Sequence, residues 1–194
     1  SEDTVRDFAN SIYTEAQRLI TLVNDIIKIS RLDEGADLER ENVDLLEISE
    51  NAAQTLKASA DKKNVKIAVN GESATVFGVR QILEEMVYNL LDNAVKYNKD
   101  GGTAAVNIEN LGSEVKLTVW DTGIGIDPSQ QERIFERFYR VDKSRSKAEG
   151  GTGLGLSIVK HGAMYHGAAL YVKSSLGEGT EIVIRFKKKT SGGR

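Results

Sequence analysis

Apolar residues recur at alternating three- and four-residue intervals along the first 30 positions of the chain. Residues 4–33 contain neither glycine nor proline, and the recurring positions are Val5, Phe8, Ile12, Leu19, Leu22, Ile26 and Ile29. This spacing predicts one long amphipathic helix with the seam of a helical bundle. We expect the helix to end at Gly35 and to pack on partner helices outside the main domain. A core helix of that domain is the alternative.

The remainder of the chain mixes helical and strand patterns and predicts an α+β domain. A 3.6-residue apolar period indicates helices, and short alternating runs indicate strands. The expected helices cover 45–60, 78–97 and 153–165, and Asp44 is the expected N-cap of the first. The expected strands cover 65–69, 74–77, 103–109, 115–120, 169–172 and 181–186, the third and fourth forming a hairpin.

Composition narrows the classes of function. The chain has 194 residues, a net charge of −3, 40% apolar residues and no cysteine. The acidic balance argues against general nucleic-acid binding, and the lack of cysteine excludes a disulfide framework and thiolate metal sites. No signal peptide opens the chain, and no apolar run approaches the length needed to span a membrane. The start inside a helical pattern suggests a piece of a longer protein, whose absent segments would make any membrane contact.

Polar side chains share one face of the helix expected over 78–97. Glu85, Asn89, Asn93 and Lys96 fall within about 80° of one another on a helical projection. The opposite side, expected to face the core, carries Leu83, Val87, Leu90, Leu91 and Ala94. Amide oxygens can serve as ligands for Mg²⁺, and a lysine one turn later can pair with phosphate. A magnesium and phosphate site is therefore one interpretation, and an ordinary solvated face is the other.

Two glycine-rich motifs complete a candidate nucleotide site. Asp121 follows an expected strand and is backed by Gly123 and Gly125, so its carboxylate could accept a hydrogen bond from an exocyclic amine such as that of adenine. A simple Asp-Gly turn is the alternative. The second motif, residues 150–162, is a glycine loop that opens a helix and would present free N–H groups to an anion.

The irregular stretch 121–150 is long enough to be an active-site lid. Its expected apolar anchors are Ile134, Phe135, Phe138 and Tyr139, and its basic residues are Arg133, Arg137, Arg140, Lys143, Arg145 and Lys147. Because the arginine fork matches phosphate oxygens, the lid could close over a polyphosphate, or it could be a solvated basic loop. Residues 177–180 form either a turn or a site that brings the Thr180 hydroxyl near the base.

Taken together, these segments resemble the ATP-binding domain of two-component sensor histidine kinases. The sequence NLLDNAVKY resembles the N box of that family, DTGIGI the G1 box, FERFYR the F box and GTGLGL the G2 box, in matching order and spacing. The segment NDIIKISRLDEG is similar to the second helix of its dimerisation hairpin. The resemblance covers nearly the whole chain and divides it into that helix (1–35), a catalytic ATP-binding domain (36–190) and a tail (191–194).

The resemblance implies a two-layer α/β sandwich, the Bergerat fold, with a mixed sheet and helices on one face. It also implies ATP and Mg²⁺ as cofactors, phosphoryl transfer to a histidine, relay to a response-regulator receiver domain, and a homodimer through the helical hairpin. Because most members are membrane sensors with cytoplasmic kinase cores, the resemblance implies a cytoplasmic location. The implied catalytic residues are Asn89, Lys96 and Arg140, and the implied metal ligands are Asn93 and Asn89. The implied nucleotide-binding residues are Asn89, Asn93, Lys96, Tyr97, Asp121, Gly123, Gly125, Ile126, Arg140, Gly151, Thr152, Gly153, Leu154, Gly155, Leu156 and Thr180.

One departure from the family limits the expected activity. The His-Glu-x-x-Thr/Asn-Pro acceptor box is missing, and the two histidines, His161 and His166, read as ordinary residues near a helix end. We therefore expect the chain to bind ATP without phosphorylating itself. Two alternatives are a nucleotide-sensing interaction module and a serine kinase of the anti-sigma type. The latter class lacks the long hairpin helix.

Overall fold

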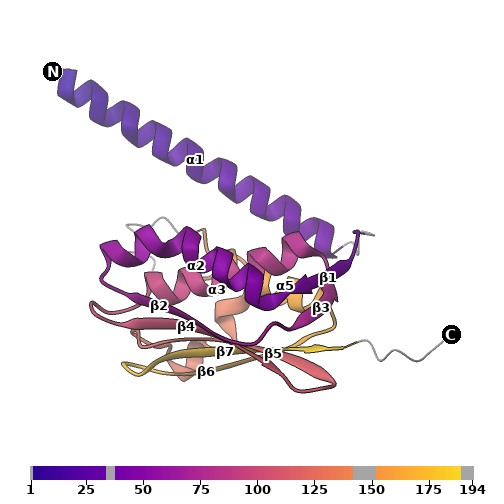
Figure 1. Ribbon diagram of the computed structural model, residues 1–194. Helices are drawn as coiled ribbons and strands as arrows, with labels where there is room; N and C mark the ends of the chain where they lie inside the picture. Colours follow the sequence, from indigo (N-terminus) through magenta and orange to yellow (C-terminus); the bar gives the residue numbers. More distant parts are fainter. Residues whose placement is uncertain (1, 34–37, 142–151, 189–194) are drawn as a thin grey trace.

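A computed structural model describes residues 2–33, 38–141 and 152–188 and places them in a long helix and a layered α/β unit (Figure 1). The helices are α1 (Glu2–Asp33), α2 (Leu45–Lys62), α3 (Arg80–Lys96) and α5 (Gly155–Tyr165), with 3₁₀ turns η1 (Pro128–Gln130) and η2 (Arg133–Phe135). The strands are β1 (Glu41–Asp44), β2 (Lys66–Gly71), β3 (Thr75–Gly78), β4 (Thr103–Asn110), β5 (Glu114–Asp121), β6 (Ala169–Ser175) and β7 (Gly179–Lys187).

Five strands form a mixed sheet in the order β2-β4-β5-β7-β6. Strand β2 runs parallel to β4, and the other neighbouring pairs are antiparallel. Helices α2, α3 and α5 cover one face of this sheet (Figure 1). The predicted α+β sandwich with helices on one side is therefore confirmed, as is the predicted hairpin, which joins β4 to β5.

The core lies between that face of the sheet and α3. The apolar side of α3 is fully buried, as its period predicts, and it packs against inward-facing residues of the central strands such as Val106, Leu117 and Ile184. Burying each large aliphatic side chain stabilises the fold by roughly 1.5–3 kcal/mol. Because this packing fixes the rotation of α3, it also fixes where the polar side of the helix faces.

A second, two-stranded sheet escapes the sequence analysis. Strand β3 forms where a strand was expected, but it pairs antiparallel with β1 rather than joining the main sheet. Strand β1 has four residues, of which only Val43 is buried, and this is too short for a periodic signal. The expected N-cap of α2 is confirmed, since the Asp44 carboxylate accepts a hydrogen bond from the Leu46 N–H at 2.9 Å.

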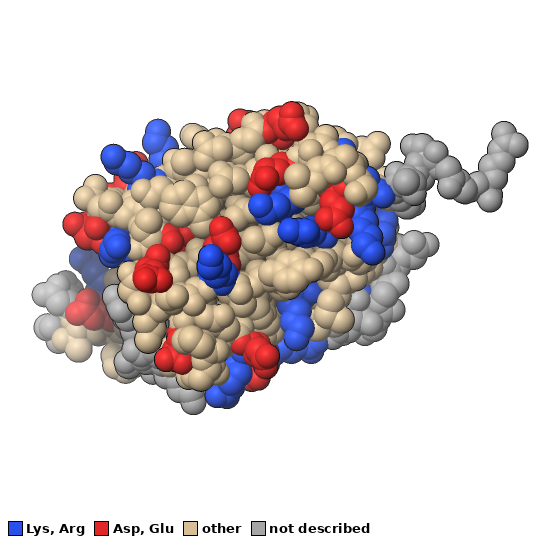
Figure 2. All heavy atoms as spheres, turned by 90° about the horizontal axis from the view of Figure 1, so that it is seen from below, with Lys and Arg blue, Asp and Glu red and all other residues tan. Residues whose placement is uncertain are grey.

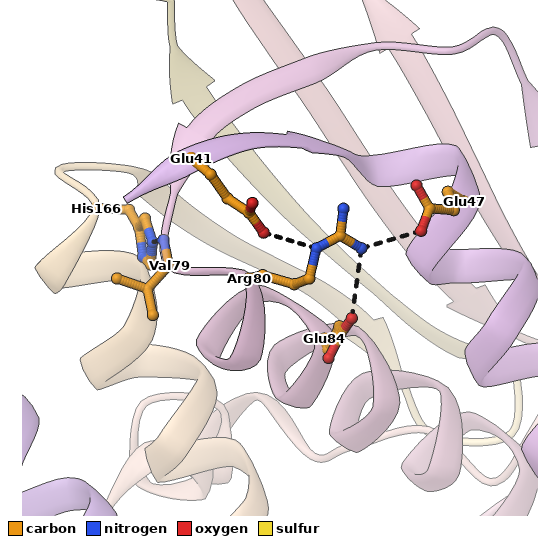
Figure 3. Close-up of polar contacts among 6 residues, drawn as sticks. All are labelled: Glu41, Glu47, Val79, Arg80, Glu84 and His166. Carbon is orange, nitrogen blue, oxygen red and sulfur yellow. Dashed lines mark hydrogen bonds and ion pairs between the residues drawn. The ribbon is translucent and has the colours of Figure 1, made fainter. Parts of the chain in front are cut away.

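Arg80, at the start of α3, ties three elements together (Figure 3). Its Nε bonds the Glu41 carboxylate at 2.7 Å, and its Nη1 lies 2.9 Å from Glu47 and 3.6 Å from Glu84. The Glu41 and Glu47 carboxylates raise the pKa of the guanidinium. Since the group is open to solvent, the network orients β1, α2 and α3 more than it stabilises them.

His166 has a structural role at the end of α5 (Figure 3). Its Nε2 accepts a hydrogen bond from the Val79 N–H at 3.0 Å, and its Nδ1 lies 2.7 Å from the Gly162 carbonyl oxygen, to which it donates. A Cβ at Gly78 would come within 2.6 Å of the ring, which accounts for the glycine there. Burial lowers the pKa of His166, and the nearby Arg40 charge adds to this effect.

Helix α1 contacts the rest of the molecule only near its C-terminal end, within the described residues. Ile29 is buried with Leu154 and Ile158, and Leu22 packs beside them. The remaining seam faces outward, with large apolar side chains exposed at Val5, Phe8, Ile12, Leu19 and Ile26. The alternative, that this helix belongs to the core of the main domain, thus holds only for its last turns. The packing of the seam on partner helices stays a prediction. The described part of the helix extends to Asp33, and the expected end at Gly35 lies outside the described residues.

Side chains of both charges are mixed on one face of the molecule. Figure 2 shows Lys and Arg interspersed with Asp and Glu over the face seen from below, rather than gathered by sign. A mixed face of this kind is typical of solvated surface.

Across ranges 2–33, 38–141 and 152–188, no helix is both long and apolar enough to cross a membrane.

We predict that protonation of His166 destabilises the fold. The neutral ring accepts from Val79, so its lowered pKa contributes stability above the unfolded value near 6.5, and this stability is lost as the pH falls below that value. In denaturant titrations, His166→Gln should be clearly less stable than the parent chain at pH 7.5, and the gap should narrow at pH 5.5. His161→Gln serves as the control, with little effect at either pH. A His166→Gln gap that is the same at both pH values would contradict the prediction.

Candidate functional site

A cavity of about 410 Å³ opens beside α3 and α5, at the ends of β5 and β7. Helices α3 and α5 lie against each other at this edge of the sandwich (Figure 1). The cavity brings together most of the residues expected from the sequence: Asn89, Asn93, Lys96, Tyr97, Asp121, Gly125, Ile126, Arg140, Thr152, Gly153, Gly155, Leu156 and Thr180.

Two expected residues in the described part of the chain do not line the cavity, and a third lies outside that part. Gly123 lies behind its wall, where a Cβ would come within 2.4 Å of the Tyr97 carbonyl oxygen. The side chain of Leu154 is fully buried against Ile29 of α1 and does not line the cavity, and its expected contact with a nucleotide stays a prediction. Gly151 lies outside the described residues.

The sequence analysis missed the apolar part of the lining. It consists of Leu90, Ala94, Val119, Ile124, Ile134, Tyr139, Val141 and Ile182, together with the polar Asp92. A usable signal existed for two of them. Val119 and Ile182 lie two residues from Asp121 and Thr180 on their strands, and residues two apart on a strand share a face.

Asp121 lies at the end of β5, directly opposite Thr180 of β7. Its Oδ1 accepts a hydrogen bond from the Gly123 N–H at 2.7 Å, and the Thr180 N–H also donates to the carboxylate. Burial nevertheless raises the pKa of Asp121 to about 6. A partly desolvated carboxylate beside a cavity can accept a further hydrogen bond from a ligand. Titratable groups with pKa values shifted in this way are common at functional sites.

The polar face of α3 forms a second wall. Asn89 donates through Nδ2 to the Glu85 carbonyl oxygen at 2.9 Å, and its Oδ1 lies against Gly155, where a Cβ would approach within 2.7 Å. Asn93 and Lys96 continue this wall toward the end of the helix. Glu85, also expected on this face, is not part of the lining and pairs instead with Lys28 of α1. The amide oxygens of Asn89 and Asn93 are therefore the candidate metal ligands of this wall.

The third wall suits an anion. Helix α5 begins at Gly155 with no side-chain cap, and ahead of it the Leu154 N–H donates to the Thr152 hydroxyl at 3.3 Å. The Nη2 of Arg140 is buried and finds no hydrogen-bond partner among the described residues. A helix N-terminus and an unpaired guanidinium nitrogen on one cavity fit a phosphate group.

The described part of the expected lid, up to residue 141, is less irregular than predicted, because it contains η1 and η2. Ile134 is buried as an anchor, and Arg133 stacks on Tyr139 with its Cζ 4.3 Å from the ring centroid. Phe138 is not an anchor: it is 53% exposed and adopts a φ of 64°. Its backbone N–H instead donates to the Gly153 carbonyl oxygen. The basic residues Lys143, Arg145 and Lys147 lie outside the described residues.

We predict that Asp121→Asn stabilises the protein at neutral pH. An acid whose pKa is raised in the folded state contributes stability only below that pKa, and this stability is lost as the pH rises from 3.8 towards 6. Because the carboxylate is only half-buried, we expect a gain of about 1 kcal/mol at pH 7.5 and almost none at pH 4. Chemical denaturation at both pH values measures it.

The matched control is Asp127→Asn, six residues further along the chain. The Ser129 hydroxyl and N–H donate to the Asp127 carboxylate and lower its pKa, so this substitution should reduce stability at pH 7.5. A loss of stability in Asp121→Asn at pH 7.5 would contradict the account of a desolvated carboxylate.

Comparisons with known proteins agree with this geometry. The family described as histidine kinase-, DNA gyrase B- and HSP90-like ATPase matches residues 78–190. The sensor-like histidine kinase SenX3 of Mycolicibacterium smegmatis is 37% identical over 184 residues, covering 94% of this chain and 48% of that protein. The sensor histidine kinase YkoH of Bacillus subtilis is 32% identical over 192 residues, covering 99% and 42%. The chain spans about half the length of these relatives.

Solved structures give the same result. The mycobacterial sensor histidine kinase MprB is 30% identical, with a TM-score of 0.68, over 77% of this chain and 97% of that one. Full-length ShkA in complex with AMPPNP is 27% identical, with a TM-score of 0.81, over 96% of this chain and 40% of that one. The chain therefore belongs to the histidine kinase-, DNA gyrase B- and HSP90-like ATPases and contains a catalytic domain of the sensor histidine kinase type.

Proposed function

We propose that the cavity binds ATP with Mg²⁺ and positions its γ-phosphoryl group for transfer to a histidine outside this chain. The observation that carries the proposal is the presence of two groups in one cavity. The Asp121 carboxylate keeps a raised pKa despite two N–H donors, and the Nη2 of Arg140 has no hydrogen-bond partner among the described residues. One needs a hydrogen-bond donor and the other needs an acceptor. An adenine amine and a phosphate on one ligand satisfy both.

At the base end, Asp121 would accept a hydrogen bond from the adenine amine, and the Thr180 hydroxyl lies on the neighbouring strand for a second polar contact. The apolar side chains Val119, Ile124 and Ile182 would enclose the faces and edge of the purine. This combination of a few placed polar groups and an apolar lining is typical of ligand cavities.

At the phosphate end, Asn93 and Asn89 would offer amide oxygens to Mg²⁺, and Lys96 would pair with phosphate charge. Bound Mg²⁺ would neutralise charge that develops on the transferred group. The N-terminus of α5 and the backbone at Gly153 would hold the phosphates, and Arg140 would contact the γ-phosphate. The residues thus act by positioning and by charge neutralisation.

The cavity suits a kinase better than an ATP hydrolase. The related ATPases carry a catalytic glutamate where this chain has Asn89, and an amide cannot take a proton from water. Glu85, one turn earlier, is bound to Lys28 and lies outside the lining. ATP would therefore persist in the site until an acceptor histidine arrives.

Residues 1–35 are proposed to be one helix of a dimerisation hairpin, followed by the catalytic domain in 36–190 and a tail in 191–194. The outward-facing seam of α1 supports this division. Asp25 of α1 also accepts a hydrogen bond from Thr152 in the cavity wall at 3.3 Å, so the helix can influence the nucleotide loop directly. A homodimeric parent, a cytoplasmic site of action and transfer to a response-regulator aspartate belong to the same proposal.

We predict that Asn93→Ala weakens Mg-ATP binding by about 100-fold or more, because the variant loses an oxygen ligand that cannot be replaced locally. Calorimetry with and without Mg²⁺ measures binding, and labelled ATP with the acceptor hairpin added in trans measures transfer. Removal of Mg²⁺ should bring the parent chain to the level of the variant.

The control is Asn51→Ala, which removes an exposed amide on α2 and should change neither binding nor transfer. Normal turnover by Asn93→Ala would refute the assignment of this wall to the metal and phosphates.

A further inference from the structure

Ser174 lies in β6, behind the base end of the cavity, and is not part of the lining. Its hydroxyl nevertheless contacts three groups, two of which belong to residues of the cavity wall. It accepts a hydrogen bond from the Ile126 N–H at 2.8 Å, lies 2.7 Å from the Gly179 carbonyl oxygen and lies 2.9 Å from the Thr180 hydroxyl oxygen. Both Ile126 and Thr180 line the cavity, so this one side chain connects two of its walls.

The three contacts restrict the directions in which the hydroxyl protons of Ser174 and Thr180 can point. A serine hydroxyl has one proton and two lone pairs, and the Ile126 N–H occupies one lone pair. When Ser174 donates to the Gly179 carbonyl oxygen, its second lone pair accepts from Thr180. When Ser174 donates to Thr180 instead, the Thr180 proton turns away from it. In both arrangements the contact with Ser174 restrains the position of the Thr180 hydroxyl oxygen, and in the first it also directs the Thr180 proton.

Backbone contacts hold the loop after β5 close to the turn between β6 and β7, so that the Ser174 hydroxyl can reach both segments. The Gly177 N–H donates to the Ile124 carbonyl oxygen at 2.8 Å, and a Cβ at Gly125 would come within 1.9 Å of the Ser175 carbonyl oxygen. Gln131 adds a bond from its Nε2 to the Ser174 carbonyl oxygen at 2.8 Å. The loop after β5 is thus docked on the turn between β6 and β7, and the Ser174 hydroxyl carries this docking to a cavity-lining side chain.

We infer that Ser174 is a positioning residue for the purine base, which holds the Thr180 hydroxyl and the Ile126 backbone at a fixed spacing from Asp121. The inference rests on the proposed nucleotide function of the cavity. It assigns to Ser174 the discrimination between purines. Adenine has an amine donor at C6 where guanine has a carbonyl acceptor, so only a rigid base end can exploit the difference.

The test compares ATP with GTP, because the two nucleotides share the same ribose and triphosphate. The parent chain should bind ATP more tightly than GTP. Ser174→Ala should weaken ATP binding about tenfold, the effect of losing roughly one hydrogen bond, and GTP binding less than about threefold. With an acceptor hairpin in trans, the loss should appear in KM for ATP, and kcat should stay within about threefold.

Two matched variants separate the hydroxyl from its surroundings. Ser175→Ala, at the exposed neighbouring position, should leave both affinities unchanged. Ser174→Thr keeps a hydroxyl and should recover most of the preference for ATP. Thr180→Val should by itself reduce the ratio of ATP affinity to GTP affinity. Adding Ser174→Ala to this variant should reduce the ratio little further, because the two hydroxyls act as a unit.

Several results would overturn the inference. Equal losses of ATP and GTP affinity in Ser174→Ala would indicate a merely structural role, and unchanged affinity for both nucleotides would remove any role. If Ser174→Ala does not fold, an unchanged ratio in Thr180→Val overturns the inference in its place. Failure of the parent chain to bind any nucleotide with Mg²⁺ would instead overturn the proposed function, and with it this inference.

Discussion

The structure around the cavity depends on a carboxylate that burial makes costly to ionise. Asp121 is held at the end of β5 with two backbone N–H donors, from Gly123 and Thr180, and these do not offset its desolvation, so its pKa remains raised to about 6. Strand pairing supplies one donor, because β7 places Thr180 opposite Asp121. The glycine turn supplies the other, at a position where a Cβ would collide with Tyr97. A ligand that brings a further donor completes the set.

The phosphate side follows from helix packing rather than from strand pairing. Because the apolar side of α3 fills the core, its amides face α5, and Asn89 meets the start of that helix at a glycine. On the same cavity, one nitrogen of Arg140 is buried without a hydrogen-bond partner among the described residues. The apolar face of α3 therefore forms part of the core, and its polar face forms one wall of the site. A substitution that rotates α3 would displace the amides before it unfolded the domain.

The sequence predicted best where local chemistry decides the structure. The amphipathic period of α3, the Asp44 cap and the hairpin of β4 and β5 are encoded within short stretches, and all three form as expected. The predictions failed where distant segments decide. Strand β1, which was not predicted, forms by pairing with β3, and Phe138, which was expected to be an anchor, is exposed where its N–H bonds the Gly153 carbonyl oxygen. Ser174 carries no motif of its own, since its contacts depend on how the turn between β6 and β7 docks on the loop after β5.

The central claim is that Asp121 recognises the amine of adenine. Calorimetric titration of the parent chain and of Asp121→Asn, each with Mg-ATP and with the purine riboside triphosphate that lacks only this amine, tests it most directly. The account predicts that the parent chain prefers ATP by on the order of tenfold or more, and that the Asn variant loses most of this preference. Equal affinity of the parent chain for both nucleotides, or an undiminished preference in the variant, would contradict it.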